Sequence, residues 1–185
     1  MTDASAFEAS AHKPVVAPLR ALPPSRAVDP VIRPLAASDL APLVELSLRA
    51  WAPVFTSIER RLAGSGVFER QHPDWRADQR AAVESACSDT DVLVAEVDGA
   101  VAGFVATTRR EDDLGEIHMI AVDPDHQRRG VGRALTQAAL ERLRAQGLAT
   151  AMVETGGDPG HEPARRLYED AGFTALPVVR YFTTL

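Results

Sequence analysis

The 185-residue sequence predicts a single α/β domain. Three observations lead to this prediction. Apolar residues recur at helical spacing before Asp91, strand-forming segments separated by tight turns follow it, and one of those strands leads through a glycine-rich loop into an amphipathic helix. Strands that alternate with helices are typical of α/β folds. The length is sufficient for one hydrophobic core and short for two.

Residues 1–30 show neither helical nor strand periodicity. They contain seven Ala, five Pro and three Ser, with three charges of each sign. Such a composition is typical of segments that bury little apolar surface. We therefore expect a flexible tail over residues 1–30 and a folded domain over residues 31–185. The domain is expected to begin at Val31 with a short edge strand, where proline is tolerated.

Two helices are expected next. The first begins at Ser38 or Asp39, either of which can cap it, and Pro53 should bend or end it. Its apolar face at helical spacing comprises Leu40, Leu43, Val44, Leu46, Leu48, Trp51 and Phe55. After a glycine-rich break, a more polar helix is expected over residues 74–86.

The rest of the sequence alternates strands with helices. Residues 92–97 and 101–107 are expected to pair as a hairpin, because Asp98-Gly99 is a strong two-residue turn. The remaining expected elements are strands over 116–122, 150–155 and 178–183, a helix that opens at 127–133 and stops at Gly147, and a helix over 163–171.

Composition argues against several classes of function. The formal net charge of −6 is unsuited to a surface that binds nucleic-acid phosphates. A single cysteine, Cys87, excludes an internal disulfide, and the five histidines show no paired spacing for zinc, so no metal is expected. No apolar run is long enough to span a membrane, and no secretory signal is recognisable, so a cytoplasmic protein without a membrane partner is expected.

The segment Gln127-Arg128-Arg129-Gly130-Val131-Gly132-Arg133 separates a strand from a helix. The first backbone N–H groups of a helix have no partner within it, and the helix dipole adds partial positive charge there. Two glycines leave room for a phosphate to approach those amides, and three arginines can add charge-assisted hydrogen bonds. The segment therefore predicts a pyrophosphate site.

Two other glycine-loop patterns do not fit this segment. A nucleotide-hydrolysing phosphate loop needs Gly-Lys-Ser/Thr, and a dinucleotide fingerprint needs a third glycine where this sequence continues with Ala134 and Leu135. The pattern Gln/Arg-x-x-Gly-x-Gly/Ala after a strand instead resembles the coenzyme A loop of the GNAT acyltransferase superfamily. Downstream, Ala164-Arg165-Arg166-Leu167-Tyr168-Glu169-Asp170-Ala171-Gly172-Phe173 resembles the second signature of that family. The resemblance covers about residues 31–185.

The resemblance implies a mixed, mostly antiparallel sheet of six to seven strands that splays between its fourth and fifth strands and is flanked by about four helices. It also implies an N-acetyltransferase that moves the acetyl group of acetyl-CoA to a primary amine by direct attack in a ternary complex. Main-chain groups of Ile120, Ala121 and Val122 would contact the pantetheine and thioester. Residues 127–133 would hold the pyrophosphate.

Three further residues take candidate roles from the resemblance. Tyr168 matches the usual general acid, which protonates the departing thiolate. The general base that accepts the amine proton is left open between Glu154, in the strand after the cofactor helix, and Glu116, on the neighbouring strand. His161 stands where relatives often carry a cofactor-binding asparagine, and it is a candidate cofactor contact, base or helix cap.

The acceptor is expected to be a small-molecule amine or a protein N-terminus. An acidic site mouth formed by Glu116, Glu154, Asp158 and Glu162 would favour a cationic primary amine. The alternative function is a non-catalytic acyl-CoA-binding or sensor protein on the same fold, which would need the cofactor loop but not Tyr168. A homodimer is compatible with either function.

Overall fold

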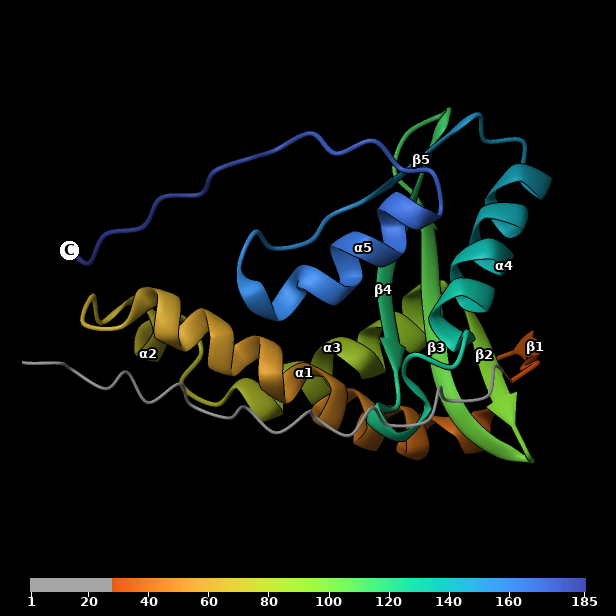
Figure 1. Cartoon of the computed structure of the whole chain (residues 1–185), viewed down its shortest axis with the longest axis horizontal. Helices are drawn as coiled ribbons and strands as arrows, with labels where there is room; N and C mark the ends of the chain where they lie inside the picture. The colour runs from red at the N-terminus through yellow and green to blue at the C-terminus, as the bar shows by residue number, and fades with distance from the viewer. Residues whose placement is uncertain (1–27) are drawn as a thin grey trace, which may run out of the picture.

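The computed structural model describes residues 28–185 (Figure 1), so most of the predicted tail lies outside the described residues. The strands are β1 (Val31–Pro34), β2 (Asp91–Val97), β3 (Ala100–Arg109), β4 (Leu114–Val122) and β5 (Thr150–Val153). The α-helices are α1 (Leu40–Leu62), α2 (Val67–Gln71), α3 (Trp75–Asp89), α4 (Val131–Ala145) and α5 (Glu162–Asp170). Three single-turn 3₁₀ helices are η1 (Ala37–Asp39), η2 (Pro124–His126) and η3 (Pro159–His161).

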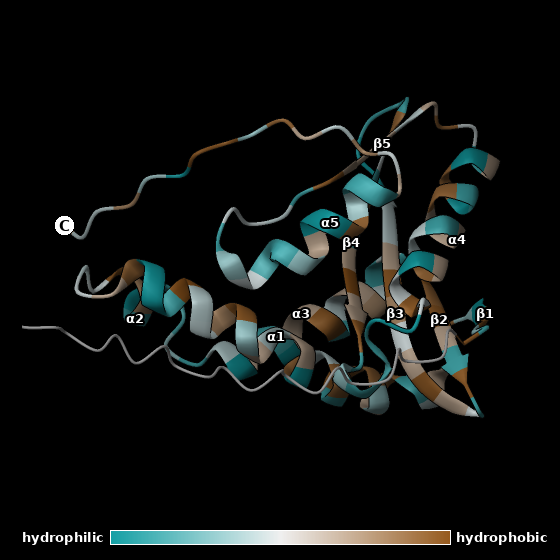
Figure 2. Cartoon of the chain, in the orientation of Figure 1, coloured by the Kyte–Doolittle hydropathy of each residue, from teal (hydrophilic) through white to brown (hydrophobic). Residues whose placement is uncertain are grey.

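The strands form one mixed sheet in the order β1-β2-β3-β4-β5. The first four are antiparallel to their neighbours, whereas β4 and β5 are parallel. Residues of α1 and α3 pack against one face, and residues of α4 against the other. In Figure 2, much of β2 and β4 has the brown colour that marks hydrophobic residues. The predicted α/β fold with a mixed sheet is confirmed.

The fourth and fifth strands separate along β4, as the resemblance implied. They pair only from Leu114 to Ile117 on β4, while β4 continues to Val122. The register between β3 and β4 shifts at the same place, which leaves His118 as an extra residue in β4. An extra residue of this kind bends a strand and increases its twist. Beyond Ile117, the edge of β4 that faces β5 therefore has no strand partner among the described residues.

The first helix decides one alternative left open by the sequence and differs from the sequence prediction in its cap. Of the two effects predicted for Pro53, a bend or an end, the helix does not end there, because Pro53 lies inside α1 and the helix continues to Leu62. The carboxylate of Asp39 makes no cap hydrogen bond to α1. It instead accepts bonds from the guanidinium of Arg33, at 2.7 and 2.9 Å, and from the backbone N–H of Ala36 at 2.8 Å. Asp39 therefore joins β1 to the start of α1.

The strand predicted over residues 178–183 is absent, and the sheet of the described residues has five strands rather than six or seven. Residues 174–185 run away from β5 without regular structure (Figure 1). Val178, Val179 and Tyr181 are 70–88% exposed, so neither face of this segment is buried. Because strand propensity reflects packing on a pleated, half-buried surface, the alternating pattern alone does not produce a strand here.

Within residues 28–185, no helix combines the length and apolar character needed to cross a membrane. Over the same residues, no group of three or more His, Cys, Asp or Glu side chains is placed to hold a metal ion.

Candidate active site

The loop between β4 and α4 carries most of the residues predicted to hold a phosphate. Gly130 is the N-cap of α4 with φ of 96°, and Arg128 has φ of 58°, which is uncommon for a residue with a side chain. Left-handed residues in such a loop turn successive N–H groups toward one side, where they form an anion-binding concavity. A Cβ at Gly132 would lie 3.3 Å from Cδ2 of Leu167. The second glycine therefore also allows α5 to pack closely on α4.

The other side chains of this loop either bond or pack within the protein or form no ion pair. The side-chain amide of Gln127 donates to the Val122 carbonyl at 3.1 Å and thereby closes the loop. The Val131 side chain is fully buried, so only its main chain is available to a ligand. Among the ion pairs of residues 28–185, none involves Arg128, Arg129 or Arg133. Within residues 28–185, no carboxylate therefore occupies these three guanidinium groups.

A residue of α1 holds the same loop in place. Arg49 forms ion pairs with Asp123, which is buried, and with Asp125 at 3.4 Å. Asp123 also accepts the Asp125 N–H at 3.0 Å and donates its own N–H to Ala102 at 2.9 Å. Sequence reasoning missed this contact because it joins residues 74 positions apart without a local motif.

Main-chain groups of the second half of β4 lie beside this loop. The Ala121 side chain is buried in the core under α1 and α3, whereas Ile120 and Val122 pack toward the core under α4. A ligand at this edge would therefore meet backbone groups rather than side chains.

Tyr168 lies on α5 and is only 7% exposed. Its ring contacts Phe173 edge-on, with centroids 5.9 Å apart. Burial raises the pKa of the Tyr168 phenol to about 12, because the charged phenolate is poorly solvated there. The hydroxyl therefore keeps its proton at neutral pH.

Hydrogen bonds of Asp158 and His161 hold the segment between β5 and α5 together. The carboxylate of Asp158 contacts Nδ1 of His161 and accepts the Gly160 N–H at 2.9 Å. That N–H also lies 2.9 Å from the Ser57 hydroxyl of α1, and Arg165 donates to the Asp158 carbonyl at 2.9 Å. His161 makes no side-chain cap bond to α5, which argues against the helix-cap alternative.

The two carboxylates considered as bases lie in different environments. The Glu154 side chain is 69% exposed and pairs with Arg180 at 2.8 Å. Glu116 is only 9% exposed, and its Oε2 has no hydrogen-bond partner among the described residues. The Arg110 Nε lies 3.4 Å from that oxygen. Glu116 is therefore the more buried of the two carboxylates, and each of them lies beside an arginine.

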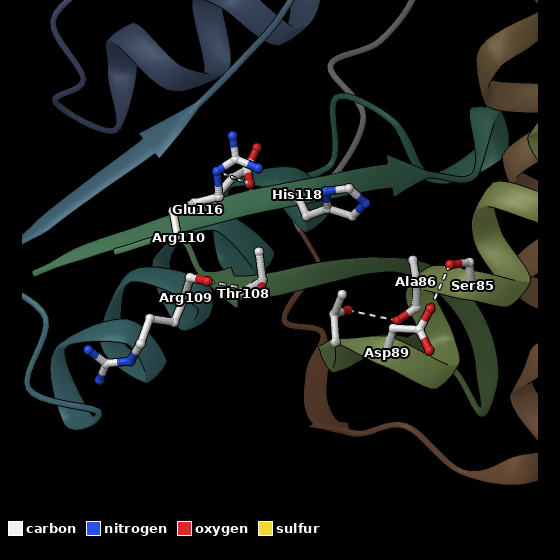
Figure 3. A pocket seen from close by; sticks show the side chains of 9 residues that line it. Ser85, Ala86, Asp89, Thr108, Arg109, Arg110, Glu116 and His118 are labelled. Atoms are coloured by element: carbon white, nitrogen blue, oxygen red, sulfur yellow. Dashed lines mark hydrogen bonds and ion pairs between the residues drawn. The ribbon is translucent and has the colours of Figure 1, made fainter. Parts of the chain in front are cut away.

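Glu116 lines a cavity of about 410 Å³ between the C-terminal end of α3, the end of β3 and β4 (Figure 3). A volume of this size is ordinary for a small-molecule site. The lining residues are Ser85, Ala86, Asp89, Thr90, Thr108, Arg109, Arg110, Glu116 and His118.

The acidic mouth expected from the sequence is largely neutralised. Each of its four carboxylates lies beside a basic group. The pairs are Glu116–Arg110, Glu154–Arg180, Asp158–His161 and Glu162–Arg166. In three of these pairs the basic group is an arginine, and in the fourth it is His161, which is charged only when protonated.

Comparison with known proteins shows relatives along most of the chain. The model of the acetyltransferase (GNAT) family matches residues 54–173. A mycothiol acetyltransferase of Cellulomonas flavigena is 34% identical over 167 residues, which cover 82% of this chain and 47% of that protein. Another, from Thermomonospora curvata, is 41% identical over 87 residues, or 47% of this chain and 29% of that protein. The chain spans less than half the length of these curated relatives.

Solved structures share the fold at low sequence identity. PaiA N-acetyltransferase from Thermoplasma acidophilum, in complex with coenzyme A, superposes with a TM-score of 0.59 at 16% identity, over 82% of this chain and 94% of that one. An aminoglycoside acetyltransferase from an uncultured soil metagenomic sample, in complex with sisomicin, superposes with a TM-score of 0.53 at 20% identity. The superposition covers 84% of this chain and 96% of that one. Together with the family match over residues 54–173, the observed sheet and loop lead to one conclusion: the chain belongs to the GNAT acetyltransferase family.

Proposed function

We propose that this protein transfers the acetyl group of acetyl-CoA to a primary amine, by direct attack of the amine in a ternary complex. The observation that carries the proposal is the buried Glu116 carboxylate. Among the described residues its buried Oε2 has no hydrogen-bond partner, the residue lines a cavity, and it lies one residue before the point where β4 and β5 separate. A protein that only bound acyl-CoA would not need such a group beside the acceptor space.

The residues around the β4–α4 loop fit acetyl-CoA. The N-terminus of α4 and the left-handed turn at Arg128 and Gly130 suit a pyrophosphate. The three arginines of the loop form no ion pair within residues 28–185 and can add charge. The free edge of β4 at residues 120–122 offers main-chain groups to the pantetheine and the thioester. We also propose His161 as a cofactor contact through Nε2, since its Nδ1 is held by Asp158. When bound, acetyl-CoA supplies the activated acetyl group.

Two residues of the chain move protons in this proposal. Glu116 accepts the proton that the amine must lose before attack, directly or through a water molecule. Tyr168 gives its hydroxyl proton to the leaving sulfur, and its raised pKa ensures that the proton is present. A backbone N–H near Ile120 or Val122 stabilises the negative charge that develops on the carbonyl oxygen. Glu154 is left outside the mechanism because its side chain is exposed.

The acceptor is proposed to be a small-molecule amine rather than a protein N-terminus. The cavity at Glu116 has the volume of a small-molecule site. Relatives and neighbours named for mycothiol and for aminoglycosides support the same choice. Use of acetyl-CoA agrees with a cytoplasmic location.

Release of free thiol from acetyl-CoA, measured with a panel of primary amines, tests this function. We expect thiol release that depends on both acetyl-CoA and an amine. Acetyl-CoA binding without thiol release for any amine would favour the non-catalytic alternative instead.

Replacement of Gly130 by Asp is expected to weaken acetyl-CoA binding by about tenfold or more, because it places a negative charge at the N-terminus of α4. Calorimetry with acetyl-CoA measures the change. Gly130→Asn is the matched control, since it imposes the same backbone strain at φ of 96° without the charge. Equal affinities of the Asp and Asn variants for acetyl-CoA would show that its pyrophosphate does not bind at this loop.

Replacement of Arg49 by Met should raise the KM for acetyl-CoA by roughly three- to tenfold with a smaller change in kcat, because the buried Asp123 carboxylate then loses its charged partner. Steady-state kinetics separates the two constants. Arg80→Met is the control, since Arg80 forms an exposed pair with Glu45 on the surface, 3.6 Å apart. A KM unchanged by Arg49→Met would show that α1 does not position the loop.

A further inference from the structure

Most polar groups that line the cavity at Glu116 are already engaged by the protein. The Asp89 carboxylate accepts hydroxyl bonds from Ser85 at 2.7 Å and from Ser88 at 2.8 Å. The Arg109 guanidinium donates to the carbonyls of Asp112 at 2.6 Å and Gln146 at 3.1 Å, and it points away from Glu116 (Figure 3). The hydroxyl of Thr90, also in the lining, donates to Ala86 at 2.7 Å. Each of these groups therefore already has a partner within the protein.

Three side chains of the lining retain bonding capacity: Glu116, Arg110 and His118. Arg110 and Glu116 point toward one another (Figure 3), but their closest contact, Nε to Oε2, is 3.4 Å and forms no hydrogen bond. The Arg110 side chain is 57% exposed, so its remaining N–H groups face space that a ligand can enter. The cavity thus presents one carboxylate and one guanidinium side by side, each incompletely satisfied.

A ligand that complements this pair carries an ammonium or amine and a carboxylate close together. A guanidinium binds a carboxylate through two parallel hydrogen bonds, and the amine would lie against Glu116. Because Nε of Arg110 and Oε2 of Glu116 are 3.4 Å apart, a ligand whose two groups stand on the same carbon atom can reach both residues with only a small shift of Arg110. A diamine would instead bring a second positive charge next to Arg110. A simple amine, which has no carboxylate, would leave Arg110 beside the Glu116 carboxylate, which must accept the proton.

We propose that the acceptor is an α-amino acid and that Arg110 determines this specificity by binding its carboxylate. This proposal rests on the proposed acetyltransferase function and narrows the acceptor to one class of amine. Binding moves Arg110 from Glu116 to the substrate carboxylate and so frees Glu116 as the base. The amine nitrogen then forms a bond to the acetyl carbonyl carbon and the bond from that carbon to sulfur breaks. One proton of the substrate ammonium passes through Glu116 to water before the attack, and a second leaves the nitrogen by the same route after it. The sulfur receives its proton from Tyr168, and water returns a proton to Tyr168.

Matched acceptors test the proposal with the full-length protein. Each amino acid is compared with its amide and with the decarboxylated amine, and kcat/KM is measured by thiol release. The wild type is expected to favour the acid by roughly tenfold to a hundredfold, the contribution of charge-assisted hydrogen bonds. Arg110→Gln should bring the ratio of acid to amide close to one. Arg109→Gln, the neighbouring arginine bound to carbonyl groups, should keep the wild-type ratio.

The outcomes separate this proposal from the function on which it rests. If amines are acetylated without preference for the carboxylate, or if Arg110→Gln lowers kcat/KM equally for all three acceptors, the amino-acid proposal is wrong and the acetyltransferase function stands. If no amine of any class releases thiol, both fail. Retention of the acid preference in Arg110→Gln would also overturn the role of Arg110.

Discussion

Replacement of Glu116 by Gln is expected to lower kcat by about 10²- to 10⁴-fold, the usual contribution of a positioned general base. Glutamine keeps the shape of the side chain and cannot accept the amine proton. The affinity for acetyl-CoA should change little, because Glu116 lies on the acceptor side of β4, in the cavity formed with α3 and β3. Steady-state kinetics and calorimetry measure the two effects.

Glu154→Gln is the matched control for this prediction, because it makes the same chemical change at the exposed carboxylate that the sequence also offered as a base. We expect less than a threefold change in its kcat, in line with the small contribution of an exposed ion pair. A large loss in Glu154→Gln together with near-normal activity in Glu116→Gln would reverse the assignment. A thermal melt of each variant shows whether a loss of activity comes from unfolding.

Replacement of Tyr168 by Phe is expected to lower kcat by roughly 10²-fold or more, because the variant keeps the buried ring and loses the proton donor. The contact with Phe173 does not involve the hydroxyl, so thermal stability at neutral pH and acetyl-CoA affinity should barely change. A coenzyme thiol, with a reference pKa of about 8.5, needs a proton as it leaves. Wild-type kcat in Tyr168→Phe would remove Tyr168 from the mechanism and leave water as the proton source.

The raised pKa of Tyr168 adds a check at alkaline pH. A phenol titrates at about 10 in the unfolded chain, and in the folded chain at about 12. The unfolded state therefore loses this proton first, and unfolding becomes easier as pH rises. The stability that the protonated phenol contributes is complete below pH 10 and is lost as pH rises through about 12. Melting temperatures of the wild type should fall more steeply over this range than those of Tyr168→Phe.

Local chemistry made several features of the fold predictable from the sequence. Asp98 and Gly99 both adopt positive φ, as a two-residue hairpin turn between twisted strands requires. Asp74 precedes α3 and accepts the Ala77 N–H at 3.1 Å, so the polar helix begins where a capping residue stands. The glycines of the β4–α4 loop likewise mark a helix start that the structure contains.

Features that depend on distant partners were not predictable in this way. Residues 178–183 have strand-like alternation, but neither face is buried in the described structure. The contact of Arg49 with Asp123 arises only when the loop after β4 is placed beside α1. For the same reason the sequence left Glu116 and Glu154 equivalent, whereas their burial distinguishes them.

Initial-velocity kinetics with acetyl-CoA and the acceptor both varied tests the central claim most directly. Direct transfer in a ternary complex predicts double-reciprocal lines that intersect, with no acetylated protein after incubation with acetyl-CoA alone. Parallel lines, together with an acetyl group covalently attached to the chain, would indicate a covalent intermediate. That result would contradict direct attack by an amine whose proton Glu116 accepts.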